Sequence, residues 1–118
     1  MSHTPFKISC IAVGNGHTGS IGTVALSRTN LTFLVSGSQD TCLKMWRLNS
    51  EELAVSDENV KSLTVLHTAV AHDKDINSVC VSPNDKLIAT GSQDKSAKVE
   101  FLAVFFYSLL IDSNEECS

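Results

Sequence analysis

The chain has 118 residues, enough for one small domain or for part of a larger one. Its hydrophobic fraction is 42 %, and Ser and Thr together fill 25 positions, a composition that favours strands and turns over helices. Nine Lys and Arg against thirteen Asp and Glu leave a net charge of −4, which argues against a free-standing nucleic-acid-binding protein, because such proteins carry a basic surface.

The N-terminal residues 1–15 contain one strand-like stretch, residues 8–13, and no sign of export. No long apolar run follows a basic head, so we expect no secretory signal. The four cysteines are far apart and include no Cys-x-x-Cys pair, so we expect reduced thiols in an intracellular compartment. We interpret residues 1–15 as a leader strand or as the end of a preceding structural unit.

Residues 16–48 predict three short strands: Val24–Leu26, Phe33–Ser36 and Thr41–Leu48. The apolar run Phe33–Ser36 is bounded by Gly37, which is typical of a strand buried on both faces. The spacing of the glycines and the β-branched residues disfavour a helix through this part of the chain.

Residues 49–62 differ in character from the segments on either side. They hold four Asp and Glu against the single Lys61, which predicts an exposed acidic insert that can include a short helical turn near residues 51–55. Residues 63–70 return to strand-like sequence and predict a fourth strand.

The second half of the chain repeats the first. His72 aligns with His17 at an offset of 55, and after a one-residue deletion Gly91–Asp94 aligns with the identical tetrapeptide Gly37–Asp40. The strands predicted in this copy are Val79–Val81 and Leu87–Thr90, followed by a third strand up to residue 99. The sequence therefore predicts an internal duplication of a β-unit.

The pattern resembles the WD-repeat (WD40) family of β-propellers. The residues that carry the resemblance are Gly16-His17, the tetrapeptide Gly37–Asp40 and Trp46, although Arg47 replaces the family's closing Asp and Ala71 replaces the Gly before His72. The resemblance covers about residues 8–99. It implies an all-β fold, a partial β-propeller with about one complete four-stranded blade plus an incomplete second blade.

On this basis the chain divides into four parts: residues 1–15, a first WD repeat at 16–70 with the acidic insert 49–62, an incomplete second repeat at 71–99, and a tail at 100–118 that lacks the family pattern. Glu100 occupies the position where the family has Trp. The apolar run Phe101–Ile111 in the tail is too short to span a membrane. We hypothesise that the tail arises from alternative splicing or a mispredicted exon, and that the isolated chain is marginally stable or aggregation-prone because it leaves strand edges open.

The resemblance also implies a structural hydrogen-bond chain inside each blade. In the first repeat Asp40 would accept hydrogen bonds from His17 and from the hydroxyl of Ser36, and the indole N–H of Trp46 would close the chain. In the second repeat His72, Thr90 and Asp94 would do the same. These residues are expected to brace the fold.

Three other kinds of site match parts of the sequence. The string Gly14–Gly19 fits the Gly-x-Gly-x-x-Gly pattern of dinucleotide-binding proteins, but a poor helix former follows it, so we favour no cofactor. A zinc site would need closely spaced ligand pairs, which the five candidates do not provide; these are His17, Cys42, His67, His72 and Cys80. We interpret Cys42 and Cys80 as small core residues. The sequence contains no Gly-x-Ser-x-Gly nucleophile elbow, so it gives little support to an enzyme.

The functional hypothesis is a non-catalytic scaffold that binds other protein subunits of a large assembly, with no metal, membrane or small-molecule substrate. Within the family, residues 15–46 and 72–79 are similar to nucleolar members of the small-subunit processome. That similarity implies a role in pre-ribosomal RNA processing, 18S rRNA maturation and ribosome biogenesis, located in the nucleus and nucleolus, with indirect contact to RNA. The alternatives are a signalling adaptor of the G-protein β type and a truncated isoform without activity.

Overall fold

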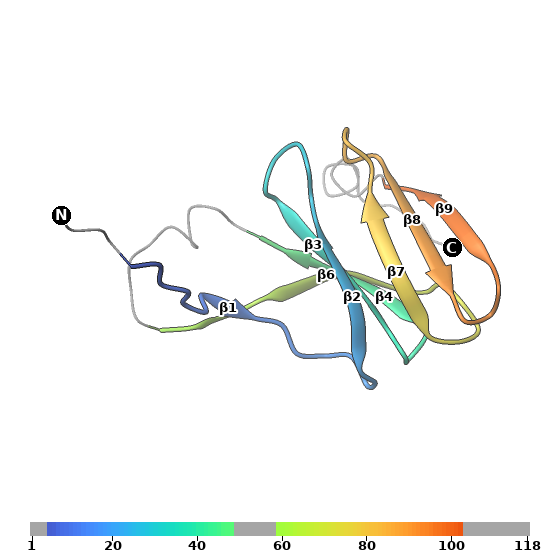
Figure 1. Ribbon diagram of the computed structural model, residues 1–118, viewed down its shortest axis with the longest axis horizontal. Coiled ribbons are helices and arrows are strands. Elements are labelled where there is room, and N and C mark those ends of the chain that lie inside the picture. Colours follow the sequence, from blue (N-terminus) through green and yellow to red (C-terminus); the bar gives the residue numbers. More distant parts are fainter. Residues whose placement is uncertain (1–4, 49–58, 103–118) are drawn as a thin grey trace.

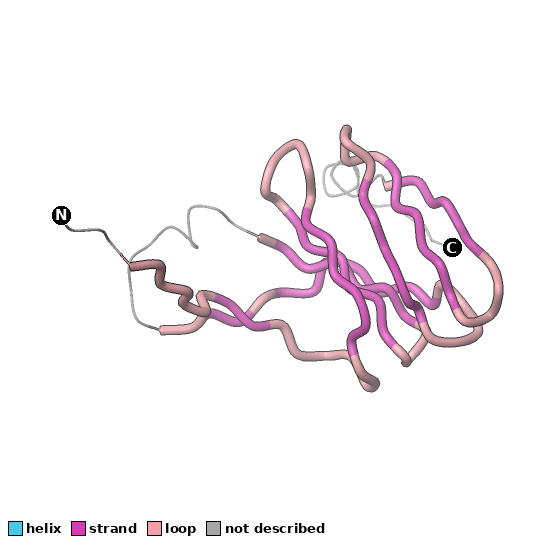
Figure 2. Tube along the Cα trace, viewed as in Figure 1, coloured by secondary structure: helices cyan, strands magenta, loops and turns pink. Residues whose placement is uncertain are grey.

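The computed structural model describes residues 5–48 and 59–102, and this part of the chain forms strands, turns and loops without a helix (Figures 1 and 2). The strands lie in one four-stranded sheet, one three-stranded sheet and one short parallel pair. The predicted all-β fold is confirmed, and the four-stranded and three-stranded sheets are the complete blade and the incomplete blade of a partial propeller.

The first sheet has the antiparallel order β2-β3-β4-β6. Its strands are β2 (Ile21–Leu26), β3 (Phe33–Ser38), β4 (Cys42–Arg47) and β6 (Thr64–Val70). The tight turn between β3 and β4 contains Thr41 at φ 73°, a left-handed conformation that the neighbouring polar side chains stabilise.

The second sheet has the antiparallel order β7-β8-β9, with strands β7 (Ile76–Val81), β8 (Leu87–Ser92) and β9 (Ala97–Phe101). It repeats the register of the first sheet. Val79 pairs with Thr90 where Val24 pairs with Ser36, and the irregularity that follows Ile21 recurs after Ile76. The duplication predicted from sequence is therefore a duplication of strand register as well as of residues.

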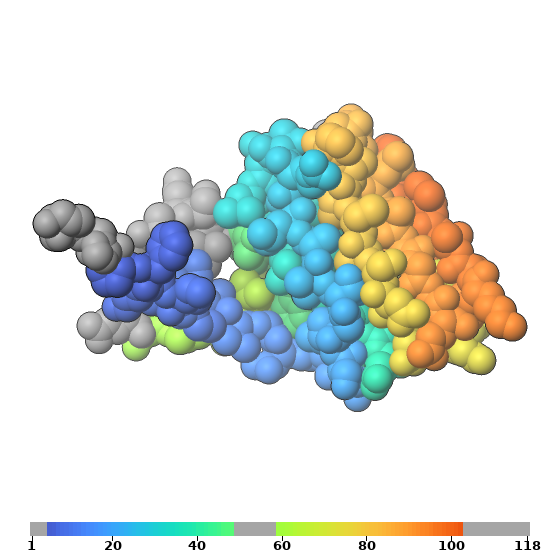
Figure 3. Space-filling view, in the orientation of Figure 1, coloured from blue at the N-terminus to red at the C-terminus, as the bar shows by residue number. Residues whose placement is uncertain are grey.

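The two sheets pack face to face, with β2 and β3 against β7 (Figure 3). Alternate residues of each strand point into this interface, and the buried cluster contains Phe33, Val35, Leu43, Met45, Ala71, Ile76, Val79, Val81 and Ile88. The closest approach is at Gly37, where a Cβ atom would lie 2.6 Å from Cγ2 of Ile76. Only glycine allows β7 to come this near to β3.

The third sheet is a short parallel pair of β1 (Ala12–Val13) and β5 (Lys61–Ser62). Of the strand predicted at 8–13, only these last two residues are strand, and the end of the predicted acidic insert forms β5 rather than loop. Residues 49–58, which include the helical turn considered at 51–55, lie outside the described residues.

The second sheet departs from prediction in two ways. Strand β9 continues through Glu100 to Phe101, and Leu102 packs against the core, so the described structure passes beyond the boundary drawn after Val99. The remainder of the tail, residues 103–118, lies outside the described residues.

Burial in the second sheet also differs from expectation. Leu87 is 40 % exposed, so the apolar run that forms β8 is buried on one face only. Cys80 is exposed, so the prediction that it is a small core residue is wrong. Both side chains lie on the face of the second sheet that no described strand covers. Cys42 is half-buried.

Candidate functional site

Four side chains of the first sheet form one hydrogen-bonded chain. His17 lies in the loop before β2, Ser36 is on β3, Asp40 is in the β3–β4 turn and Trp46 is on β4. Nδ1 of His17 is 2.9 Å from Oδ2 of Asp40, and Nε2 is 2.6 Å from Oγ of Ser36. The indole N–H of Trp46 donates to the same Ser36 oxygen at 2.8 Å. The structure thus brings together all four residues that sequence analysis selected in this repeat.

The order of donors along this chain differs from the one expected. Asp40 was expected to accept from both His17 and Ser36, but the imidazole lies between the carboxylate and the hydroxyl. The Ser36 oxygen accepts the indole N–H of Trp46 and also lies within hydrogen-bond distance of Nε2 of His17, so this hydroxyl joins the two rings.

Asp40 is held by its own turn as well as by His17. Its Oδ1 accepts the backbone N–H of Cys42, its Oδ2 accepts that of Thr18, and the hydroxyl of Ser38 accepts the backbone N–H of Asp40. Burial by itself would raise the pKa of Asp40, but the hydrogen bonds from Cys42, His17 and Thr18 outweigh it and lower the pKa from 3.8 to about 2. The residue is therefore an ionised acceptor that ties the β3–β4 turn to the loop before β2.

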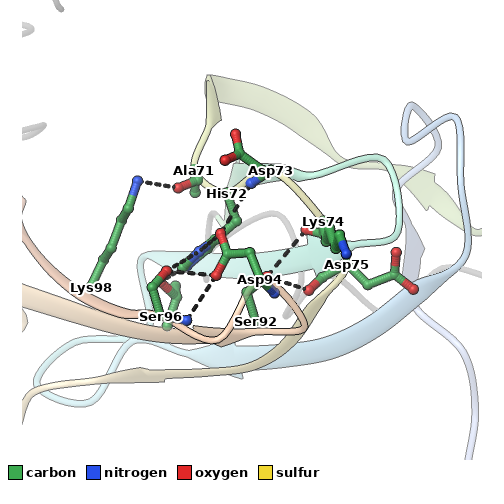
Figure 4. Close-up of polar contacts among 10 residues, drawn as sticks. Ala71, His72, Asp73, Lys74, Asp75, Ser92, Asp94, Ser96 and Lys98 are labelled. Carbon is green, nitrogen blue, oxygen red and sulfur yellow. Dashed lines mark hydrogen bonds and ion pairs between the residues drawn. The ribbon is translucent and has the colours of Figure 1, made fainter.

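The second sheet repeats the arrangement with one replacement (Figure 4). Nδ1 of His72 is 2.9 Å from Oδ2 of Asp94, and Nε2 is 2.8 Å from the Thr90 hydroxyl. Ser96 adds a hydrogen bond to Asp94 at 2.6 Å, and this bond, together with those from Asp73 and His72, lowers the pKa of Asp94 despite the opposing effect of desolvation. Sequence analysis did not select Ser96, whose aligned partner in the first repeat is Cys42.

The second chain lacks the member that Trp46 supplies in the first. Glu100, its counterpart, pairs across the sheet with Ile88 and is exposed. The Thr90 oxygen therefore receives no indole N–H. The sequence signal for this difference was the Glu at position 100, and the structure shows that the strand forms in spite of it.

The chemistry open to these residues follows from their burial. Ser36, His17 and Asp40 occur in the hydrogen-bond order of a serine-hydrolase triad, but Ser36 is 1 % exposed and its oxygen already accepts from Trp46. No substrate carbonyl can reach that oxygen in this arrangement. The two histidines have both ring nitrogens in hydrogen bonds, so neither offers a free nitrogen to a metal.

The alternative sites lack the geometry that their ligands need. The Gly14–Gly19 string leads into β2, a strand, so no helix N-terminus faces a phosphate there. Within residues 5–48 and 59–102, no three His, Cys, Asp or Glu residues are grouped as they would be around a metal ion. No helix in that same part of the chain is long and apolar enough to cross a membrane.

Sequence analysis missed Asp85, which joins the two sheets. Its carboxylate lies over the β2–β3 turn and accepts the backbone N–H groups of Arg28 at 2.6 Å, Thr29 at 2.9 Å and Asn30 at 3.5 Å. The Thr29 hydroxyl also donates to the Pro83 carbonyl. Burial alone would raise the pKa of Asp85, but these three N–H groups lower it. The sequence around Asp85 indicates only a turn, because its partners are 55–57 positions away in the chain.

The carboxylates of Asp40, Asp85 and Asp94 make the unfolding free energy fall at acidic pH. Because their folded pKa values are lowered, they favour the folded state above the unfolded pKa of 3.8, and this contribution is lost as pH falls towards the folded value of about 2 for Asp40. We expect the unfolding free energy to be constant from neutral pH to about pH 5 and to fall steeply below about pH 4.

Denaturant titrations across this range test the prediction. In the Asp40→Asn variant the stability should be lower at neutral pH and should fall less on acidification than in the native chain. Parallel pH profiles for the two proteins would contradict the role given to Asp40.

Antiparallel blades that lie side by side, with innermost strands β2 and β7 adjacent and a His–Asp pair in each, define a β-propeller repeat protein. Residues 8–47 and 63–99 match the family described as WD domain, G-beta repeat, and the chain belongs to this WD40 family. The second matched segment includes β6, which pairs with β4 in the first sheet. The family's sequence repeat is therefore offset by one strand from the sheet.

Individual proteins show how far the similarity extends. The chain is 51 % identical over 96 residues to transducin beta-like protein 3 of Mus musculus, covering 79 % of this chain and 12 % of that protein. It is 34 % identical over 88 residues to U3 small nucleolar RNA-associated protein 13 of Saccharomyces cerevisiae, covering 71 % and 10 %. A chain in the crystal structure of the mitotic checkpoint complex has the same fold, with a TM-score of 0.56, 18 % identity and coverage of 72 % and 23 %.

Proposed function

We propose that this chain is a non-catalytic WD-repeat scaffold that binds protein subunits of a nucleolar assembly acting in pre-ribosomal RNA processing and ribosome biogenesis. Its similarity to a U3 small nucleolar RNA-associated protein is the observation that carries the proposal. The chain is more similar still to transducin beta-like protein 3, and this similarity supports the same role in ribosome biogenesis. The chain spans about a tenth of the length of these relatives, so the proposal concerns the part that these two repeats contribute.

The geometry of the polar residues supports a scaffold. The side chains arranged in the order of a catalytic triad are His17, Ser36 and Asp40 with their counterparts His72, Thr90 and Asp94, and these are occupied with one another. What the two sheets present outward is strand faces and turns, which are surfaces suited to protein partners. The net charge of −4 favours indirect contact with RNA through those partners.

Sedimentation of the tagged full chain from nuclear extract tests this proposal. We expect it to co-sediment with large particles that contain U3 small nucleolar RNA. An amine-reactive crosslinker should attach it to protein, and ultraviolet light should not attach it to RNA. The Trp46→Ala variant, in which the first blade should not form, is the matched control and should stay at the top of the gradient. Sedimentation of the native chain with membrane-associated G-protein complexes would contradict the proposal and favour the signalling adaptor.

A further inference from the structure

The two sheets leave two apolar faces uncovered among the described residues. The head face, on the first sheet, consists of Ile21, Val24, Leu26 and Leu34. The tail face, on the second sheet, consists of Cys80, Leu87, Ala89, Gly91, Val99 and Phe101. Val24 is 58 % exposed and Val99 is 67 % exposed, which is unusual for strand residues in a packed β protein.

The internal repeat shows what each face is built to contact. The head face aligns with Ile76, Val79, Val81 and Ile88, the residues through which the second sheet covers the first. The tail face aligns with the residues of the first sheet that those side chains cover, which include Ala25, Phe33, Val35, Gly37 and Met45. The chain therefore carries both halves of an interface that it already forms once within itself.

The space around Gly37 and Gly91 supports this correspondence between the two faces. At Gly37 the second sheet fills the space a side chain would need, since Cγ2 of Ile76 is 2.6 Å from the position of a Cβ. At Gly91, the counterpart, the nearest atom to such a Cβ is Oγ of Ser78 at 3.1 Å, and no other atom of the described residues lies within 4 Å. Ile21, the counterpart of Ile76, is 46 % exposed. The space beside Gly91 is therefore open among the described residues, and Ile21, whose counterpart Ile76 fills the matching space at Gly37, is exposed.

A strand edge is left open in the same way. In the first sheet β6 is the fourth strand, paired with β4, and it leads directly into His72. In the second sheet β9 has no fourth strand among the described residues and lies at the edge of its sheet (Figure 1). The segment aligned with β6 is residues 9–15, which leads into His17, and only Ala12–Val13 of that segment is strand.

We propose that copies of this chain associate head to tail. The head face of a first copy covers the tail face of a second copy, with Ile21 of the first against Gly91 of the second. Residues 9–15 of the first copy then pair with β9 of the second, as β6 pairs with β4 within one chain. The contact joins two different faces, so each added copy leaves one head face and one tail face free until the assembly closes. With two blades in the described part of each copy, and propellers of four to eight blades, a closed ring holds about two to four copies.

A pair of matched substitutions tests the interface. Leu26 lies on the head face and is 51 % exposed, whereas Leu31 lies in the β2–β3 turn and is 49 % exposed, so Leu→Asp at the two positions has the same chemistry and the same exposure. Light scattering on the native full chain should give two to four times the mass of 12.7 kDa. Leu31→Asp should keep that mass, and Leu26→Asp should reduce it to a single subunit.

A mixing experiment distinguishes a head-to-tail contact from any other. Gly91→Val should block the tail face, because the added side chain fills the space beside this position, and should also give single subunits. Leu26→Asp retains an intact tail face and Gly91→Val an intact head face, so an equimolar mixture should form a dimer with one copy of each, detectable by native mass spectrometry.

Three results would overturn the proposal. They are a native chain that stays a single subunit at every concentration or grows without limit, equal loss of mass in Leu31→Asp and Leu26→Asp, and failure of the two blocked variants to pair. A native chain that stays a single subunit would leave the two faces to a different protein chain.

Discussion

Replacing Trp46 with alanine should lower the free energy of unfolding by about 3–5 kcal/mol, the range for deleting a large buried aromatic side chain. Trp46 is 2 % exposed, and its ring fills the space above Gly14, where a Cβ would lie 2.7 Å from the indole. The substitution also removes the N–H that Ser36 accepts. A loss of this size is a large part of the stability of a small domain, so we expect the variant to be unfolded at 37 °C.

Trp46→Phe separates the packing from the hydrogen bond. Phenylalanine keeps most of the apolar volume but donates no hydrogen bond to Ser36, so the loss should be about 1 kcal/mol. Thermal melts followed by circular dichroism measure both variants without relying on tryptophan fluorescence, which they lack. If the phenylalanine and alanine variants melted together, the indole N–H would be the dominant contribution, and the packing argument would be wrong.

Replacing Asp85 with alanine should lower the free energy of unfolding by about 3 kcal/mol, because three backbone N–H groups lose a charged acceptor. These groups belong to Arg28, Thr29 and Asn30 in the β2–β3 turn, so the loss falls on the junction between the two sheets. Alanine is also strained at this position, since Asp85 has φ 61°. We expect a lower midpoint in urea unfolding with a single transition.

Asp85→Asn and Asp85→Gly divide this loss into its parts. Asparagine tolerates the left-handed conformation and keeps one acceptor oxygen, so it removes mainly the charge and should be the mildest of the three. Glycine removes the acceptor but relieves the backbone strain, so it should fall between asparagine and alanine. A glycine variant as stable as the native protein would show that the hydrogen bonds to the carboxylate contribute no more than the relief of backbone strain at this position.

Much of the fold could be predicted because the two halves of the sequence can be aligned with each other. The identical tetrapeptides Gly37–Asp40 and Gly91–Asp94 place a turn at the same point of both copies, and the apolar runs before them become β3 and β8. The histidines follow from the same alignment, since His17 lies 23 residues before Asp40 and His72 lies 22 residues before Asp94, one fewer because of the deletion. Local pattern and repeat together are enough where all the partners lie within one sheet.

Features that depend on contacts between sheets, or on uncovered surface, could not be predicted in this way. Asp85 resembles an ordinary turn residue, and only its distance to Arg28 and Thr29 reveals its partners. Cys80 and Leu87 have core-like character in sequence, yet they are exposed because burial depends on a neighbouring sheet. The position of the His17 ring between Asp40 and Ser36 required coordinates, since either nitrogen of a histidine can face either partner.

The offset of one strand between sequence repeat and sheet couples the two blades. Strand β6 is the first part of the second matched repeat, but it forms hydrogen bonds with β4 of the first sheet. The first repeat alone therefore does not contain all four strands of its sheet. Loss of the second repeat would strip the first blade of its outer strand and of the cover over Gly37 at once. Cooperativity is thus built into the chain's connectivity, and damage in one blade spreads to the other in a single folding transition.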